Sequence, residues 1–149
     1  MSMNRVAGIA LLLSACLAGG CAEWGKVLDS LGDEPVENTY WKLTQFNGSS
    51  VVATERQRQA HFILHHESGR MTGSGGCNGV SATYKLEGDR LSFGPLAGTM
   101  MACPQGMEAE RNFLSTLQKG GRARVASQQL ELLDGGGGVA ARFDAIYNK

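Results

Sequence analysis

Two stretches decide the fold of this chain: Met71–Gly79, which reads MTGSGGCNG, and Gly98–Pro104, which reads GTMMACP. Each contains one cysteine, Cys77 in the first and Cys103 in the second. Between them, residues 81–93 alternate apolar and polar side chains on both sides of a Glu-Gly-Asp-Arg turn. Alternation that is interrupted by a short turn predicts a β-hairpin, which here lies between the two cysteines.

Length and charge limit the classes of function. The chain has 149 residues, which is enough for one domain with a modest core. Lysines and arginines number 14, as do aspartates and glutamates, so the formal net charge is zero. A neutral chain gives no electrostatic reason to expect binding to nucleic acid or to an anionic membrane surface. Twenty-one glycines beside three prolines indicate many tight turns.

The N-terminus predicts export. Arg5 supplies a positive charge, and Val6–Leu13 is an apolar run that is too short to span a bilayer, as in a secretory signal peptide. Leu13–Cys16 resembles the lipobox of bacterial lipoproteins, where a signal peptidase cuts before a cysteine that carries a diacylglyceryl group. Cys16 is therefore the predicted lipidation site. Cys21 follows a weaker copy of the box and is the alternative site.

Acylation at either cysteine predicts attachment to the cell envelope through an N-terminal lipid anchor. The residue after the cysteine is Leu17 or Ala22, and neither is the aspartate that favours inner-membrane retention in many proteobacteria. We therefore expect the outer membrane, with the protein facing the periplasm. The predicted organisation is a signal peptide at residues 1–15 (alternatively 1–20), a tether at 16–38 and a folded domain at 39–149.

The folded part alternates in a way that is typical of short antiparallel strands, with one helix among them. A helical apolar pattern follows Pro104 and ends at Gly120, which predicts a helix over Gln105–Lys119. The predicted strands are Thr39–Phe46, Ala60–His66, Met71–Gly75, Ser81–Leu86, Leu91–Phe93, Ala123–Ser127, Gln129–Leu133 and Val139–Ile146. The fold class is therefore α+β: a curled sheet or partly open barrel of about seven to eight strands, mainly antiparallel, with one helix covering it.

Cysteine pairing is the main prediction for a functional or structural site. Cys77 and Cys103 are separated by 26 positions in a chain that is expected to mature in an oxidising compartment, which favours a disulfide between them. Such a bond would stabilise the domain by roughly 3.5 kcal/mol through loop closure. If Cys21 is acylated, Cys16 is removed with the signal peptide, and Cys77 and Cys103 are the two cysteines left to pair. If Cys16 is acylated, Cys21 remains in the mature protein as an unpaired cysteine.

The same residues leave a catalytic alternative open, in which Cys77 is a nucleophile and a nearby histidine is its base. The candidate bases are His61, His65 and His66. On a strand, His61 and His65 share one face while His66 points to the other, so at most two of them can join one metal site. We therefore predict no catalytic residue, no metal site and no cofactor.

Methionines form the remaining cluster with chemical potential. Met100, Met101, Cys103 and Met107 are soft ligands that would suit Cu(I). Methionine more often fills irregular gaps in a core, so we expect the three methionines to pack beneath the helix.

Several of these motifs together resemble the META/HslJ-like domain. They are Gly75–Asn78 (GGCN), Pro95–Pro104 (PLAGTMMACP), the pairs Met107-Glu108 and Phe113-Leu114, and an opening strand at Thr39–Gly48. The resemblance covers Thr39–Tyr147. It implies a β-rich envelope domain: bacterial members are often lipoproteins, some are heat-inducible and linked to novobiocin tolerance, and no enzymatic activity is established for the family.

The expected function is therefore a non-catalytic envelope lipoprotein that binds a protein or lipid partner and has a role in envelope stress. The acylation signal, the neutral charge and the lack of a catalytic constellation favour this interpretation. The alternative is a thiol- or metal-dependent periplasmic enzyme that uses Cys77.

Overall fold

The computed structural model describes residues 33–52 and 58–147. The predicted signal peptide, the lipidation sites Cys16 and Cys21 and most of the predicted tether lie outside these residues. Within the two described ranges, no helix is both long enough and apolar enough to cross a membrane.

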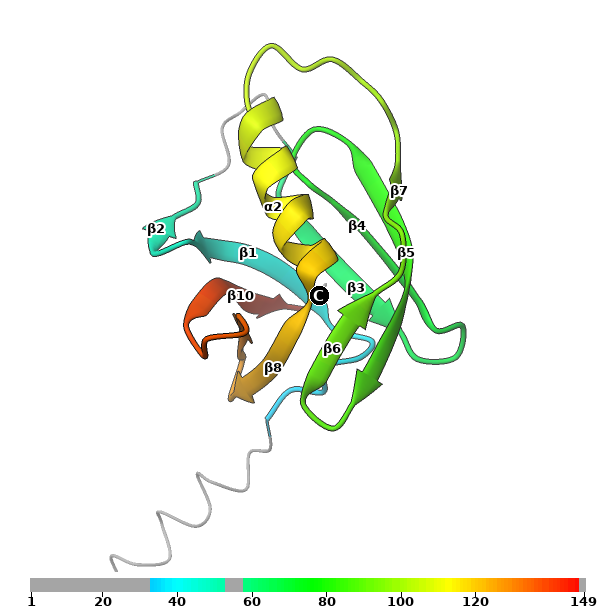
Figure 1. Cartoon of the computed structure of the whole chain (residues 1–149), viewed down its shortest axis with the longest axis vertical. Coiled ribbons are helices and arrows are strands. Elements are labelled where there is room, and N and C mark those ends of the chain that lie inside the picture. The colour runs from blue at the N-terminus through cyan, green and yellow to red at the C-terminus, as the bar shows by residue number, and fades with distance from the viewer. Residues whose placement is uncertain (1–32, 53–57, 148–149) are drawn as a thin grey trace, which may run out of the picture. The chain divides into compact units, whose positions relative to one another are not determined.

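The described residues form ten strands and one helix (Figure 1). The strands are β1 Tyr40–Phe46, β2 Ser49–Ser50, β3 His61–His65, β4 Arg70–Ser74, β5 Gly79–Glu87, β6 Arg90–Phe93, β7 Ala97–Gly98, β8 Gly121–Ala126, β9 Gln129–Leu133 and β10 Val139–Ile146; the helix is α2 Met107–Lys119. Every strand and the helix that the sequence predicts are present. The two short strands β2 and β7 are additional.

Eight of the strands close into a barrel. They follow one another in the order β1-β3-β4-β5-β6-β8-β9-β10, and β10 pairs with β1 to complete the ring. All pairings are antiparallel. β2 pairs with the last two residues of β1, and β7 pairs with Val80 and Ser81 near the start of β5. The predicted α+β class with a helix over a barrel is confirmed. The pairing from Tyr40–Ile146 to Phe46–Ala141 closes the barrel between the first and last strands.

Backbones approach closely where β3 meets β4. Gly73 faces Phe62 across this pair, and a Cβ atom on Gly73 would lie 2.2 Å from the carbonyl oxygen of His61. No side chain larger than hydrogen fits there without moving a strand.

The barrel interior is filled by side chains. Strand alternation turns one face of each strand inward, and the largest fully buried residues are Trp41, Phe62, Phe113, Phe143, Leu64, Met71, Leu91, Leu117, Leu130 and Leu132. The rings of Phe62 and Phe143 pack edge to face with centroids 4.9 Å apart, and Phe113 of α2 lies 6.1 Å from Phe143. The helix thus contributes an aromatic side chain to the same core as the barrel strands.

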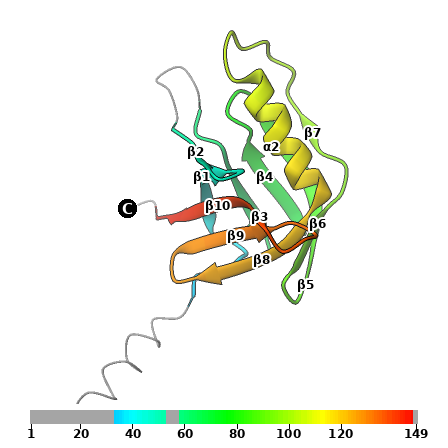
Figure 2. The ribbon, with the colours of Figure 1, turned by 60° about the vertical axis from the view of Figure 1, so that its left-hand side comes forward.

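Helix α2 lies against the barrel and connects β7 to β8 (Figure 2). It begins at Met107, two positions later than predicted, because Gly106 has a φ of 86° and a left-handed residue cannot continue into the helix. Phe113 and Leu117 on its inner face are buried. Near its end, the side chain of Gln118 donates to the Gly94 carbonyl at 3.2 Å and accepts from the Leu96 amide at 3.2 Å.

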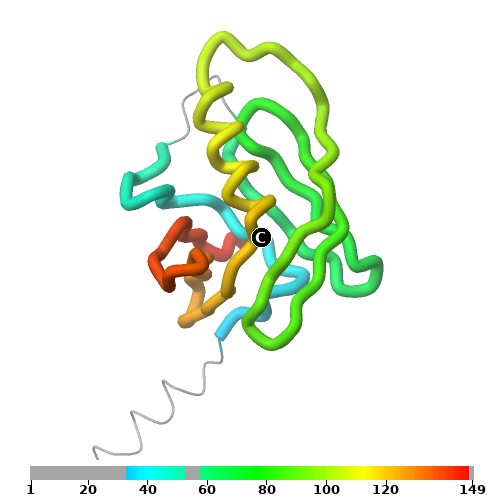
Figure 3. Tube along the Cα trace, in the orientation of Figure 1, coloured from blue at the N-terminus to red at the C-terminus, as the bar shows by residue number. Residues whose placement is uncertain are grey.

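The segment before β1 contacts the barrel. Residues 33–38 fall in the predicted tether, yet the Trp41 indole donates to the Val36 carbonyl at 2.8 Å, and Glu37 accepts a hydrogen bond from Tyr84. The segment before β1 lies at one end of the domain, and the loop between β7 and α2 lies at the other end (Figures 2 and 3). The folded unit therefore includes residues that precede Thr39.

Candidate functional site

The predicted cysteine pair lies at the junction of the β4–β5 turn and the loop before α2. The structure places the sulfur atoms of Cys77 and Cys103 at disulfide distance, with Cα atoms 6.2 Å apart. Cys77 is in the turn after β4, and Cys103 is in the loop that leads from β7 to the helix. The bond therefore holds the glycine-rich turn to the entry of α2, as the sequence predicts.

Glu110 is the centre of this site, and sequence analysis missed it. Its side chain is only 4% exposed, and one carboxylate oxygen accepts the backbone N–H groups of Cys77 and Asn78, both at 2.7 Å. The other oxygen accepts the side-chain amide of Asn78, also at 2.7 Å. Three hydrogen bonds compensate the cost of burying the carboxylate. The carboxylate thus serves as the acceptor for backbone N–H groups in the turn between β4 and β5.

Asn78 extends the network to the loop. Its amide oxygen accepts the Thr99 hydroxyl and the Met101 N–H, each at 2.8 Å. Its amide nitrogen donates to the Met101 carbonyl at 3.3 Å as well as to Glu110. The role of Asn78 is therefore structural, and its side-chain partners lie in the distant loop and on α2.

Gly75 makes room for the buried carboxylate. A Cβ atom at this position would lie 2.5 Å from Cγ of Glu110. The sequence does contain a signal for Glu110: it falls three residues before Phe113 and seven before Leu117, so it shares their face of the helix. A carboxylate on a buried helix face requires donors, and those donors come from a turn more than thirty positions earlier.

The catalytic alternative requires a free thiol at Cys77. In the structure its sulfur lies at disulfide distance from Cys103, and its N–H already donates to Glu110. The three histidines have other partners: His61 stacks on Tyr40 with ring centroids 4.3 Å apart, His65 bonds the Thr72 hydroxyl at 2.7 Å, and His66 bonds Glu37 at 2.7 Å. Among the described residues, no group of three or more His, Cys, Asp or Glu side chains could hold a metal ion.

The expectation that Met100 and Met101 pack beneath the helix is wrong. Met100 is 100% exposed and Met101 is 48% exposed. The reason is the Asn78 network, which holds Thr99 and the backbone of Met101 and leaves Met100 projecting between them. Of the methionines in the described residues, Met71 of β4 is fully buried in the core.

A second polar cluster joins the segment before β1 to the barrel. The Tyr84 hydroxyl and His66 both bond the carboxylate of Glu37. The hydrogen bond from Tyr84, assisted by His66, lowers the pKa of Glu37. Burial, with the Glu37 carboxylate beside it, raises the pKa of Tyr84 well above its ordinary value. The hydrogen bonds from Tyr84 and His66 to Glu37 attach residues 33–38 to the barrel.

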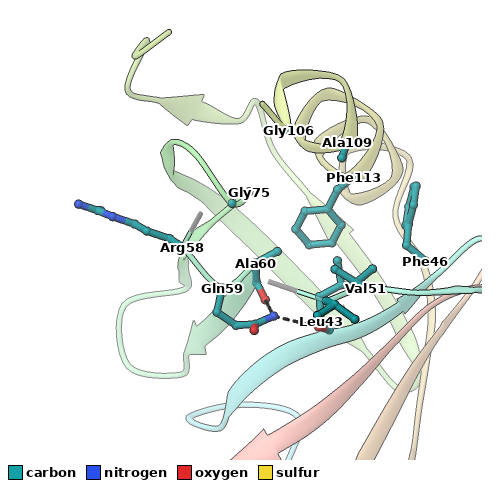
Figure 4. A pocket seen from close by; sticks show the side chains of 12 residues that line it. Leu43, Phe46, Val51, Arg58, Gln59, Ala60, Gly75, Gly106, Ala109 and Phe113 are labelled. Atoms are coloured by element: carbon teal, nitrogen blue, oxygen red, sulfur yellow. Dashed lines mark hydrogen bonds between the residues drawn. The ribbon is translucent and has the colours of Figure 1, made fainter. Parts of the chain in front are cut away.

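A small apolar cleft opens beside the glycine turn (Figure 4). Its free volume is about 80 Å³, and its walls come from β1, the residues after β2, the Gly75-Gly76 turn and the first turns of α2. The apolar side chains that line it are Leu43, Phe46, Val51, Val52, Ala60, Ala109 and Phe113. Gln59 donates to the Leu43 carbonyl at 3.1 Å, and the Arg58 side chain points away from the cleft.

The closed barrel, its covering helix and the disulfide-held loop define a class of small helix-capped β-barrel domains. The model of the META domain family matches residues 34–146, and the chain belongs to that family.

Two solved structures share the fold. An NMR structure of a protein from Burkholderia xenovorans is 24% identical with a TM-score of 0.62, covering 95% of this chain and 100% of that one. A second NMR structure is 23% identical with a TM-score of 0.58, covering 72% of this chain and 89% of the other. At these identities the likeness shows the fold alone. A search of curated proteins found no match.

Proposed function

We propose that this protein is a non-catalytic lipoprotein of the cell envelope whose META domain binds a partner while an acylated cysteine anchors it. Cys16 is the proposed anchor, with Cys21 as the alternative, and the outer membrane facing the periplasm is the proposed location. A role in heat or envelope stress and in novobiocin tolerance is part of the same proposal, on the basis of the family resemblance.

One observation carries the non-catalytic part of the proposal. The groups that would serve a thiol enzyme at Cys77 are engaged in holding the loop: the sulfur with Cys103, and the N–H groups of Cys77 and Asn78 with Glu110. A catalytic thiol needs a free thiolate, and an oxyanion site needs free donors. An apolar cleft formed by the described residues lies beside this site, and such a cleft suits binding.

Alkylation of the native protein separates this proposal from a thiol enzyme. We expect neither Cys77 nor Cys103 to be labelled by iodoacetamide before reduction, and both to be labelled after it. Rapid labelling of Cys77 alone in the native protein would favour the enzyme. Metabolic labelling with palmitate tests the anchor: Cys16→Ser should abolish labelling and Cys21→Ser should not, and the reverse result would move the anchor to Cys21.

The envelope role is tested in cells. We expect a deletion strain to become more sensitive to heat, detergent and novobiocin, and the wild-type gene to restore tolerance. Unchanged sensitivity would contradict the stress role. Photo-cross-linkers at exposed positions spread over the barrel should trap a defined envelope component, and the absence of any cross-link would contradict partner binding.

A further inference from the structure

Met100 presents its sulfur to solvent. Its side chain is fully exposed, and it lies in the loop between β7 and α2 (Figure 1). Of the other methionines in the described residues, Met101 is about half exposed, Met107 is half-buried and Met71 is fully buried. Oxidation of sulfur in a protein depends on how exposed the sulfur is. The four thioethers therefore differ in how easily an oxidant reaches them, and Met100 is the most accessible.

The chain is held on both sides of Met100. The Thr99 hydroxyl and the Met101 N–H each donate to the Asn78 amide oxygen at 2.8 Å. The Thr99 N–H also donates to the Gly79 carbonyl at 3.1 Å. These bonds order the loop without using the Met100 side chain, so a chemical change in that side chain removes no buried contact. A sulfoxide oxygen disrupts an apolar core, but at this position it meets water.

The two described cysteines do not compete with Met100 for an oxidant. The sulfur atoms of Cys77 and Cys103 lie at disulfide distance. Oxidation of cysteine by peroxides begins at the thiolate, and a disulfide contains none. An oxidant that reaches this loop therefore meets the Met100 thioether as the most accessible reduced sulfur of the described residues.

We propose that Met100 is a site of reversible oxidation by peroxides and hypohalous acids. The oxidant transfers one oxygen atom to a sulfur lone pair: an S–O bond forms, the O–O or O–halogen bond breaks, and the sulfur loses two electrons. Hydrogen peroxide leaves as water, and hypochlorous acid leaves as chloride and a proton. Methionine sulfoxide reductases reverse the step with two thiols as reductant, which form a disulfide and release the oxygen as water. This inference goes beyond the proposed function and does not depend on it.

Hydrogen peroxide and peptide mapping test the site. The protein purified from cells is treated with peroxide, reduced, digested with trypsin and sequenced by tandem mass spectrometry; Met71 falls in peptide 71–85, and the other three methionines fall in peptide 91–111. We expect Met100 to gain oxygen before Met101 and at least about tenfold faster than Met71. In concentrated urea all four rates should become similar. Earlier oxidation of Met71 or Met101, or an order that persists in urea, would overturn the proposal.

Met100→Leu and its neighbour Met101→Leu form a matched pair, since each removes one thioether from the same loop and keeps a side chain of similar size. We expect Met100→Leu to lose the fastest oxygen addition and Met101→Leu to retain it. Wild-type protein that carries one oxygen on Met100 should keep its melting temperature, because the sulfoxide faces water. A first oxidation in Met100→Leu as fast as in the wild type, or a lower melting temperature after that single oxidation, would overturn the proposal.

The full exposure of Met100 also predicts the stereochemistry of the product. With both sulfur lone pairs open to solvent, the two sulfoxide epimers form in similar amounts, and each type of methionine sulfoxide reductase accepts one epimer. We expect either reductase alone to remove about half of the oxygen at Met100, and both together to remove all of it. Complete removal by one enzyme, or no removal by both, would overturn the proposal.

A cellular experiment tests the modification where the protein functions. Protein recovered from cells after a brief exposure to hypochlorite should carry the sulfoxide at Met100, and protein from untreated cells should not. Met100 that stays unmodified in the treated cells would overturn this inference and leave the proposed function intact.

Discussion

At the scale of single residues, one carboxylate organises the loop region. Glu110 accepts hydrogen bonds from the backbone of Cys77 and Asn78 and from the Asn78 side chain. Asn78 in turn holds Thr99 and Met101. Because every member of this network is bonded to the next, loss of the carboxylate leaves buried donors without an acceptor.

Glu110→Gln tests this network. The new amide NH₂ would face either the two backbone N–H groups or the Asn78 amide, so at least one buried donor loses its acceptor. We expect the free energy of unfolding, measured in urea, to fall by about 2–3 kcal/mol. Glu108→Gln, at an exposed position of the same helix, is the control and should change it by less than about 0.5 kcal/mol. Similar small effects in both variants would contradict the role of Glu110.

Tyr84 predicts a pH dependence on the alkaline side. Its pKa is raised above the ordinary 10.0, first by burial and then by Glu37. The folded protein therefore binds the Tyr84 proton more tightly than the unfolded chain does. The resulting stabilisation is complete below the pKa of Tyr84 in the unfolded chain, and it is lost as the pH rises toward the pKa of Tyr84 in the folded protein. We expect Tyr84→Phe to flatten the loss of stability between about pH 9 and pH 11. A slope equal to wild type in urea unfolding would contradict this assignment.

At the scale of elements, the β3–β4 pair depends on a missing side chain. Gly73→Ala would place a methyl group 2.2 Å from the His61 carbonyl. We expect at least about 3 kcal/mol of destabilisation, as for overpacking that moves a backbone. Gly135→Ala is the control, because a Cβ atom there meets nothing within 4 Å. Thermal unfolding compares the two variants, and a soluble Gly73→Ala protein with wild-type stability would show that the strands can separate without cost.

Between β6 and β8, a side chain of helix α2 supplies hydrogen bonds where the strands are not paired. β6 and β8 pair only at Arg90–Arg122 and Leu91–Gly121. Beyond that point the Gln118 side chain bonds the backbone of Gly94 and Leu96. The helix therefore covers the barrel with apolar side chains and also forms hydrogen bonds with backbone groups of the residues after β6. This second role accounts for the polar residue Gln118 near the packed face of the helix.

At the scale of the whole molecule, the disulfide joins the turn after β4 to the loop before α2, so it fixes the loop that the Asn78 network orders. Replacement of both Cys77 and Cys103 by alanine should lower the free energy of unfolding by roughly 3.5 kcal/mol. The expected fall in melting temperature is about 10–15 °C. Dithiothreitol should produce the same fall in the wild type and none in the double variant. A wild type that is insensitive to the reductant would contradict a stabilising bond.

Much of this architecture was predictable because its signals are local. Period-two alternation located the strands that form the barrel, and the Glu-Gly-Asp-Arg turn located the β5–β6 hairpin. The cysteine pair followed from the number of cysteines and the predicted compartment. Barrel closure was not predictable in this way, since β1 and β10 stand about a hundred residues apart and their pairing is decided by shared burial.

The sequence alone determined the fold class, the strands in their order along the chain and the position of the helix, because each is encoded in the spacing of neighbouring residues; the cysteine pair followed from the number of cysteines and the predicted compartment. Tertiary structure alone decided that Glu110 is buried, that Met100 is exposed and that an apolar cleft lies beside β2. The physical reason is that burial belongs to a residue's surroundings, and these come from segments that meet only when the barrel closes.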